Sequence, residues 1–244
     1  RREMGVESVD TEGISVREPH KPMRVLSEAE QKRLGAYLLR DTGSWQLGIV
    51  LCMCTGLRIG EICALRWSDI DMRERVLHVR HTMQRITVQN TESDAADSRC
   101  SKSRKTKVIL TTPKSDCSIR TIPIPEEVFR LVAKEYAACG SIPAECFFLT
   151  GTERFVEPRC LSKRFHQAAV ACEIENVTFH TLRHSFATRC IELGFDVKSL
   201  SEILGHSSVN ITLGRYVHPS MEMKRANMDK VGGILETDLS SVQP

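Results

Sequence analysis

The stretch His180-Thr-Leu-Arg183-His184-Ser-Phe-Ala-Thr188 decides how this chain is interpreted, together with two motifs that follow it, Leu204-Gly205-His206 and Arg215-Tyr216-Val217-His218. In this region polar side chains are interleaved with apolar ones that a helix would bury. Polar groups on packed helices need partners or a charged ligand. An arginine beside histidines suits a phosphate, because the guanidinium fork matches two phosphate oxygens. The region therefore predicts an anion site, with Tyr216 as a candidate nucleophile rather than a packing ring.

Length and hydropathy set the broad class of the protein. The chain has 244 residues, enough for one large domain or two small ones. No apolar run is long enough to span a bilayer, and the N-terminus lacks the charged-then-apolar pattern of a secretion signal. We therefore expect a soluble, cytoplasmic protein without a membrane partner. Because the sequence begins with Arg1 rather than Met, we also expect a fragment or a processed product.

The 10 cysteines first suggest a disulfide scaffold, but their spacing argues against one. No Cys-x-x-Cys pair occurs, and Cys52 and Cys54 are two residues apart in a helical segment, so they point to different faces. Four others stand among apolar residues and are typical of small buried side chains: Cys63, Cys146, Cys172 and Cys190. The prediction is a reduced protein with no metal site and no cofactor.

The distribution of charge is more informative than the net charge of +3. Between Arg99 and Arg120 the chain carries many basic residues and a single acid, Asp116. Such a run is a candidate contact for a phosphate backbone. The alternative is a solvated loop, which we favour for residues 98–105 taken alone. The predicted backbone contacts, in this run and elsewhere, are Lys102, Arg104, Lys105, Lys107, Arg120, Lys163, Arg164 and Arg215.

Helical signals outnumber strand signals along the chain. Ser27 and Glu30 form a capping box ahead of a helix that runs to about Arg40. Ser208 or Asn210 is expected to cap the segment that carries Tyr216. The other expected helices are 45–54, one beginning near residue 58, 125–140, 158–172, 178–193, 197–204 with Asp196 as its cap, and one after Pro219.

The remaining β-branched runs predict strands over 76–88, 107–112 and 119–124. The last two are expected to form a hairpin with Lys114 near its tip. Residues 90–105 are polar and charged, which predicts a mobile insertion. The expected fold class is α+β and mainly α-helical, with a small antiparallel β-sheet or hairpin at one edge.

The segment Thr55-Gly-Leu-Arg58-Ile-Gly-Glu61 places an arginine at the start of a helix, between apolar segments. A charge in that position needs an anionic partner. Glu61 lies three residues on, within reach of Arg58 on the same face. Arg58 is therefore either in a plain intrahelical ion pair or held by Glu61 so that it faces a phosphate.

Six polar residues lack an obvious structural role, and together they suit phosphoryl transfer. Two arginines can hold the oxygens of one phosphodiester, and a tyrosine can attack its phosphorus. A histidine can take the tyrosine proton, and a lysine can supply one to the leaving oxygen. No cluster of acidic residues has the spacing of a two-metal site. The six candidates are Arg58, Lys114, His180, Arg183, His206 and Tyr216, whereas His184 and His218 are interpreted as supporting residues.

In this order, the motifs resemble those of the tyrosine recombinases, the phage-integrase family, from about Leu26 to His218. The run from Gly205 to Pro219 looks most like integrases of conjugative transposons. The resemblance implies that Tyr216 attacks a DNA phosphate, forms a 3′-phosphotyrosyl link and frees a 5′ hydroxyl without ATP or metal. It also implies roles for the others: Arg58 and Arg183 as phosphate clamp, His180 as general base or hydrogen-bond partner, His206 as a phosphate ligand, and Lys114 as general acid.

The resemblance also implies an organisation and a set of partners. Residues 1–24 would be a linker or arm, 25–218 the catalytic domain, and 219–244 a helix and tail that dock on a neighbouring protomer. The partners would be double-stranded DNA, further copies of the chain in a tetramer, and accessory DNA-bending or excision factors. Such proteins normally carry an N-terminal core-binding domain, so the chain is expected to be a catalytic-domain fragment.

Three alternatives stay open at this stage. A type IB topoisomerase shares the chemistry but relaxes DNA as a monomer. A module of the same fold that binds DNA without catalysis is the second alternative. Lys105 and Lys107 are rivals of Lys114 for the general acid, because the insertion before them is longer than the usual connection.

Overall fold

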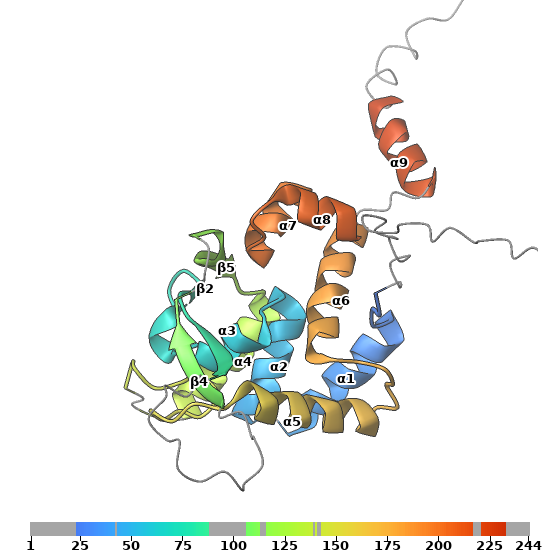
Figure 1. Ribbon diagram of the computed structural model, residues 1–244. Coiled ribbons are helices and arrows are strands. Elements are labelled where there is room, and N and C mark those ends of the chain that lie inside the picture. The colour runs from blue at the N-terminus through green and yellow to red at the C-terminus, as the bar shows by residue number, and fades with distance from the viewer. Residues whose placement is uncertain are drawn as a thin grey trace, which may run out of the picture.

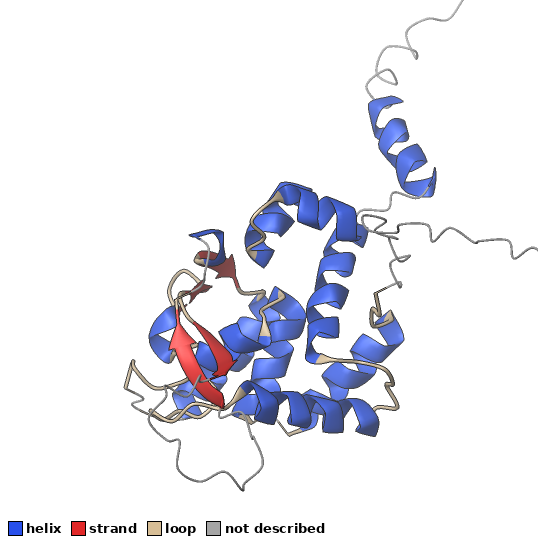
Figure 2. Cartoon of the chain, viewed as in Figure 1, coloured by secondary structure: helices blue, strands red, loops and turns tan. Residues whose placement is uncertain are grey.

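The computed structural model describes residues 23–41, 43–87, 106–112, 116–138, 140, 143–216 and 221–232. Helices dominate, and the strands gather at one side of them (Figures 1 and 2). The predicted class, α+β and mainly α-helical with a small antiparallel sheet at one edge, is confirmed. The predicted mobile insertion 90–105 lies outside the described residues.

Two helices open the described chain, and the second of them lies at the centre of the fold. α1 (Glu28–Arg40) begins at the predicted capping box, in which the Ser27 hydroxyl accepts a hydrogen bond from the Glu30 amide. α2 (Ser44–Thr55) is buried over most of its length, as expected for a helix that is apolar on all sides. Packing there is close, because a Cβ on Gly48 would lie 2.3 Å from Cδ2 of Leu149.

The larger core forms around α2. Trp67 belongs to it, with its ring 4.9 Å from that of Phe148 and 5.2 Å from that of Tyr136. The cysteines predicted to be buried are so, and every cysteine among the described residues is a free thiol. The elements that complete this core are α3 (Ile59–Ala64), the short 3-10 helix η1 (Trp67–Asp69), α4 (Glu126–Ala138) and α5 (Pro158–Ala171).

The strands form two antiparallel sheets. One has the order β1-β2-β5, and the other pairs β3 with β4. Their bounds are β1 (Ile70–Asp71), β2 (Val76–Val79), β3 (Thr82–Thr87), β4 (Thr106–Thr111) and β5 (Arg120–Pro123).

The predicted hairpin between residues 107–112 and 119–124 is wrong. β4 pairs with β3 and β5 pairs with β2, so the consecutive strands β2 and β3 supply the two partners. Burial explains this register, because Leu77 opposes Ile122 and both face the core at 0% and 1% exposure. Lys114 thus belongs to the connection from β4 to β5 rather than to a hairpin tip, and it lies outside the described residues.

A second, smaller core is built by three helices: α6 (Phe179–Glu192), α7 (Val197–Leu204) and α8 (Val209–Tyr216). Asp196 caps α7 as predicted, its carboxylate accepting from the Ser199 amide at 2.8 Å. The Ser208 hydroxyl accepts from the Asn210 amide at 3.2 Å, which favours Ser208 of the two predicted caps of α8. Tyr216 ends α8 and packs in this core.

The last described helix is α9 (Met221–Gly232), which projects away from the other helices in Figure 1. Its apolar residues Met221, Met228 and Val231 are 61%, 67% and 57% exposed. Among the residues described, no helix has the length and apolar character needed to cross a membrane.

Candidate active site

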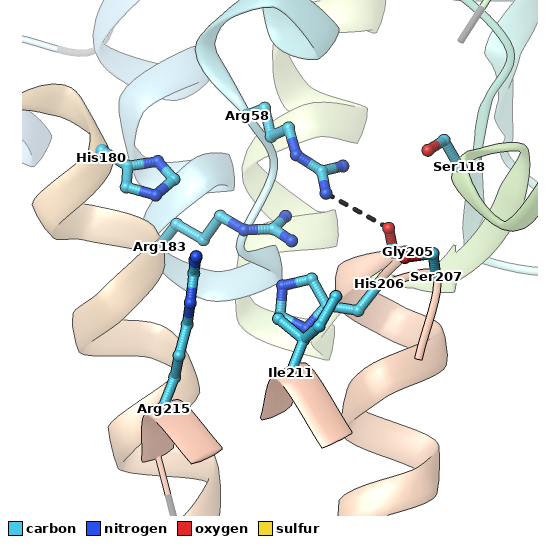
Figure 3. A pocket seen from close by; sticks show the side chains of 9 residues that line it. All are labelled: Arg58, Ser118, His180, Arg183, Gly205, His206, Ser207, Ile211 and Arg215. Carbon is cyan, nitrogen blue, oxygen red and sulfur yellow. Dashed lines mark hydrogen bonds between the residues drawn. The ribbon is translucent and has the colours of Figure 1, made fainter. Parts of the chain in front are cut away.

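One pocket collects most of the predicted site residues. It has a volume of about 280 Å³ and lies between the start of α3, the start of α6 and the turn that joins α7 to α8. Figure 3 shows arginine and histidine side chains from these elements pointing toward one another. The lining residues are Arg58, Ser118, His180, Arg183, Gly205, His206, Ser207, Ile211 and Arg215.

Arg58 stands at the N-cap of α3, at the edge of the pocket. Gly56 makes this possible, because it ends α2 in the left-handed region at φ 67°. The Arg58 guanidinium donates to Glu61 Oε1 at 2.7 Å and to the Gly205 carbonyl at 3.2 Å. The ion pair with Glu61 expected from the sequence is present, and the Arg58 side chain lines the pocket. Its contact with a phosphate stays a prediction.

Arg183 is the most deeply buried cation of the pocket, with 2% of its surface exposed. Its two terminal nitrogens donate to the Gly56 carbonyl at 2.8 Å and to the Leu204 carbonyl at 2.6 Å. Burial, followed by the positive charge of Arg58, lowers the pKa of Arg183 to about 9. The guanidinium remains protonated at neutral pH and brings a fixed positive charge to the pocket floor.

His206 follows the C-cap of α7 directly. Gly205 adopts φ 65°, which turns the chain so that the His206 ring enters the pocket. Its Nδ1 shares a hydrogen bond of 2.8 Å with the Thr212 hydroxyl, so Nε2 faces the remaining space. Burial, followed by the charges of Arg183 and Arg58, lowers the pKa of His206 to about 4. The ring is therefore neutral at neutral pH.

His180 and His184 lie one turn apart on α6, and their rings meet edge to face at 4.3 Å. His180 lines the pocket, and burial is the largest cause that lowers its pKa. His184 is 9% exposed, and burial lowers its pKa to about 4. The sequence interpretation left His184 as a supporting residue, although its spacing of four from His180 places both on one helix face.

Tyr216 does not line the pocket in this structure. Its ring is 6% exposed, and its hydroxyl shares a hydrogen bond of 2.7 Å with Nδ1 of His184. Burial raises the pKa of the Tyr216 hydroxyl, against the opposing charges of Arg183 and Arg215. In the described conformation the ring packs in the second core, contrary to the expectation that it would not be a packing ring, and the hydroxyl is bonded to His184. The role of Tyr216 as nucleophile stays a prediction.

Arg120 is placed differently from its predicted role as a DNA-backbone contact. Only 6% of its side chain is exposed, and it forms a two-fold ion pair with Glu61 at 3.1 and 2.9 Å. Its guanidinium is engaged inside the protein because β5 brings it against α3 and the end of α7. Sequence position alone did not reveal this, because Arg120 ends a run of basic residues that otherwise looks solvated.

The other predicted backbone contacts divide into three groups. Arg215 lines the pocket, and its contact with DNA stays a prediction. Lys107 on β4 and Lys163 and Arg164 on α5 are exposed, with the Arg164 guanidinium 5.6 Å from the centre of the Trp45 ring. The residues outside the described part of the chain are Lys102, Arg104, Lys105 and, among the catalytic candidates, Lys114.

The pocket can bind a tetrahedral anion. Three arginines line it, and no carboxylate among the described side chains does; the Glu61 carboxylate is paired with Arg58. Within the described ranges, no three side chains of His, Cys, Asp or Glu gather as metal ligands. An anion held there would meet guanidinium and imidazole N–H donors. Ser118 and Ser207 also line the pocket, whereas the Tyr216 hydroxyl does not and is bonded to His184.

Solved structures place this fold among known proteins. The Tn1549 transposon integrase bound to transposon right end DNA is similar, with a TM-score of 0.67 and 23% identity over 89% of this chain and 68% of that one. The XerA recombinase is similar with a TM-score of 0.61 and 25% identity over 87% and 66%. The fold is therefore that of tyrosine recombinase catalytic domains.

The chain belongs to the phage integrase family, whose sequence pattern matches residues 24–223. A XerC-like tyrosine recombinase of Caldanaerobacter subterraneus subsp. tengcongensis is 30% identical over 69% of this chain and 44% of its own length. The transposase of transposon Tn916 from Enterococcus faecalis is 25% identical over 86% of this chain and 52% of its own. The predicted resemblance is confirmed, and the chain spans about half the length of these relatives.

Proposed function

We propose that this chain is the catalytic part of a site-specific DNA recombinase that exchanges the strands of a mobile element. The observation that carries the proposal is the pocket, in which Arg58 and Arg183 point into one space with His180 and His206. The helix that forms one wall ends in Tyr216. Membership of the family supports the same chemistry, since the relatives above are named as a recombinase and a transposase.

The pocket would receive the scissile phosphate of DNA. A guanidinium has five N–H donors, and contacts with other described residues engage two of them in Arg58 and two in Arg183. The free donors would hold the non-bridging oxygens, and the two positive charges would stabilise the pentavalent transition state. His206 would donate from Nε2, because Thr212 occupies its Nδ1.

Tyr216 would supply the nucleophile. Its oxygen bonds to phosphorus, the bond from phosphorus to the 5′ oxygen of the next nucleotide breaks, and a 3′-phosphotyrosyl link and a 5′ hydroxyl result. The tyrosine proton would pass first to His184, which holds the hydroxyl at 2.7 Å and is neutral because burial lowers its pKa to about 4. His180, whose ring meets that of His184 edge to face at 4.3 Å, would act as a hydrogen-bond partner in the pocket.

Lys114 would give the leaving 5′ oxygen its proton, with Lys105 and Lys107 as the alternatives. Attack by the 5′ hydroxyl of another strand would then reverse the step and release Tyr216. Because the phosphotyrosyl bond conserves the energy of the broken ester, the cycle needs neither ATP nor a metal ion. The chemistry would thus be carried by side chains alone.

The proposal includes partners. Double-stranded DNA would be the substrate, and the expected assembly is a tetramer in which α9 of one copy docks on the next. Exposure of Met221, Met228 and Val231 on α9 supports this. Residues 1–24 would serve as linker and 25–218 as catalytic domain, with a separate core-binding domain and accessory bending or excision factors completing a cytoplasmic, DNA-associated complex.

A recombination assay with Tyr216→Phe tests the proposal. Pairs of duplexes that together cover the DNA flanking the coding sequence would be mixed with the full-length protein. We expect joint products from the wild type and none from Tyr216→Phe, with DNA binding unchanged because the ring still packs. Relaxation of supercoiled DNA without joint products would indicate a topoisomerase instead, and binding without cleavage would indicate a non-catalytic module.

A further inference from the structure

Arg120 is a buried cation that the proposed chemistry does not use. It begins β5, and its guanidinium does not line the pocket. Nonetheless its Nε donates to the Ile203 carbonyl at 2.5 Å, and one terminal nitrogen donates to the Ser118 carbonyl at 3.1 Å. The remaining contacts are the two hydrogen bonds to Glu61. A buried charge with this many directed contacts fixes the elements that supply them relative to one another.

Glu61 is the shared partner of two arginines. Its side chain is 3% exposed; Oε1 accepts from Arg58 at 2.7 Å and from Arg120 at 3.1 Å. Its other oxygen accepts from the Arg58 backbone amide at 2.9 Å and from Arg120 at 2.9 Å. Burial opposes ionisation, but the hydrogen bonds and charge of Arg120 and the charge of Arg58 lower the pKa of Glu61. The carboxylate is therefore ionised and holds Arg58 against Arg120.

Three arginines also meet at the end of α7. Arg120 donates to the carbonyl of Ile203, Arg183 to that of Leu204 and Arg58 to that of Gly205. These consecutive carbonyls lie where a helix leaves acceptors unpaired and where its dipole is negative. The next residue is His206, so the same contacts set where its ring enters the pocket.

The fit around this turn leaves little room for adjustment. A Cβ on Gly205 would lie 3.0 Å from Cδ and 3.0 Å from one terminal nitrogen of Arg120, and 3.0 Å from the Cys117 carbonyl. Arg120 thus contacts the turn on the side away from the pocket, while the two pocket arginines donate hydrogen bonds to it. A lysine could keep the charge, but its single nitrogen cannot reproduce this set of directed contacts.

We propose that Arg120 is a positioning residue, which through Glu61 and the Ile203 carbonyl sets the geometry between Arg58, Arg183 and His206. This inference rests on the proposed function for its role in catalysis, but its geometric content is independent of it. Arg120 does not line the pocket, so its loss should change the precision of the pocket and leave the contacts with distant DNA in place.

Three variants of the full-length protein test the positioning role of Arg120: Arg120→Met, Arg120→Lys and Val132→Ala. Val132 is fully buried on α4 and lines no part of the pocket, so its variant controls for lost stability alone. Single-turnover cleavage of nicked DNA, DNA affinity, and affinity for inorganic phosphate by calorimetry would be measured. Circular dichroism would verify that each variant folds.

We expect Arg120→Met to cleave about 100-fold more slowly, since small displacements of catalytic groups have effects of that size, with DNA affinity within about threefold of wild type. Arg120→Lys should lose about tenfold although it keeps the charge. Both Arg120 variants should weaken phosphate binding. Val132→Ala should change neither the cleavage rate nor the affinity for phosphate.

Wild-type behaviour of Arg120→Lys would overturn the inference, because charge alone would then suffice. An equal loss in Val132→Ala would overturn it as well, because general stability would then explain the effect. If the wild type cleaves no DNA while Arg120→Met still weakens phosphate binding, the proposed function fails and the positioning role stands.

Discussion

At the scale of single residues, Arg58 and Arg183 line the same pocket but differ in what surrounds them. The Arg58 side chain is 36% exposed and forms an ion pair with Glu61, whereas Arg183 is 2% exposed and donates to two backbone carbonyls. Removing Arg183 would leave the carbonyls of Gly56 and Leu204 buried without donors. Removing Arg58 would leave Glu61 still paired with Arg120.

Methionine substitutions should therefore separate catalysis from stability. We expect Arg183→Met to lower the free energy of unfolding by about 2–3 kcal/mol, because buried acceptors lose their partners. Arg58→Met should cost about 1 kcal/mol or less. Both should slow DNA cleavage by about 100- to 1,000-fold, as for a lost donor to a charged transition state. Urea unfolding and single-turnover cleavage measure the two effects, and equal stability losses would contradict this distinction.

The two neutral histidines of the site make stability depend on pH. Burial lowers the pKa of His184 and of His206 from 6.5 to about 4 in the folded state. Between these values the unfolded chain binds more protons, so the free energy of unfolding increases with pH. This contribution is complete above about pH 6.5 and is lost as the pH falls toward 4.

The corresponding measurement is urea unfolding at about pH 7 and about pH 5. The wild type should be less stable at the lower pH. A His184→Gln/His206→Gln variant should lose part of that difference, because glutamine does not titrate. An unchanged pH dependence in the double variant would show that other groups cause it.

At the scale of elements, the turn from α7 to α8 is where the site is assembled. Gly205 meets two demands there: φ 65°, and the close approach of Arg120. Gly194 follows α6 with φ 81°, and no atom lies within 4 Å of a Cβ added there. The two glycines thus share a left-handed backbone and differ in the space around them.

Alanine at these glycines tests the role of that space. Gly194→Ala should cost about 1–2 kcal/mol of stability from backbone strain alone. Gly205→Ala should cost about 2–4 kcal/mol, because overpacking against Arg120 adds to the strain. Only Gly205→Ala should slow DNA cleavage strongly. Similar cleavage rates for the two variants would show that the turn tolerates displacement.

The elements also show which features a sequence can predict. Caps act within a few residues, so Ser27 and Asp196 located two helix starts correctly. Strand pairing depends on distant residues: the burial of Leu77 opposite Ile122 pairs β5 with β2, and the hairpin expected around Lys114 does not form. The contacts of Arg120 with Ile203 and of Tyr216 with His184 depend on how separate elements pack, and residue spacing alone did not reveal them.

At the scale of the whole molecule, α9 carries the proposed assembly. Its apolar residues Met228 and Val231 are 67% and 57% exposed, which is unfavourable unless another surface covers them. A Met228→Glu/Val231→Glu variant should multimerise on DNA about tenfold more weakly, because apolar anchors dominate such contacts. Cleavage of nicked DNA by a single copy should persist. Sedimentation analysis would measure the assembly, and unchanged multimers would exclude α9 as the contact.

The central claim concerns the bond between Tyr216 and DNA. The most direct measurement incubates the full-length protein with nicked duplexes in excess EDTA, isolates adducts that survive denaturation, and maps the modified peptide by mass spectrometry. The mechanism predicts a DNA adduct on Tyr216 that forms without divalent metal and is absent from Tyr216→Phe. An adduct on another residue, or one that forms only with metal, would contradict it.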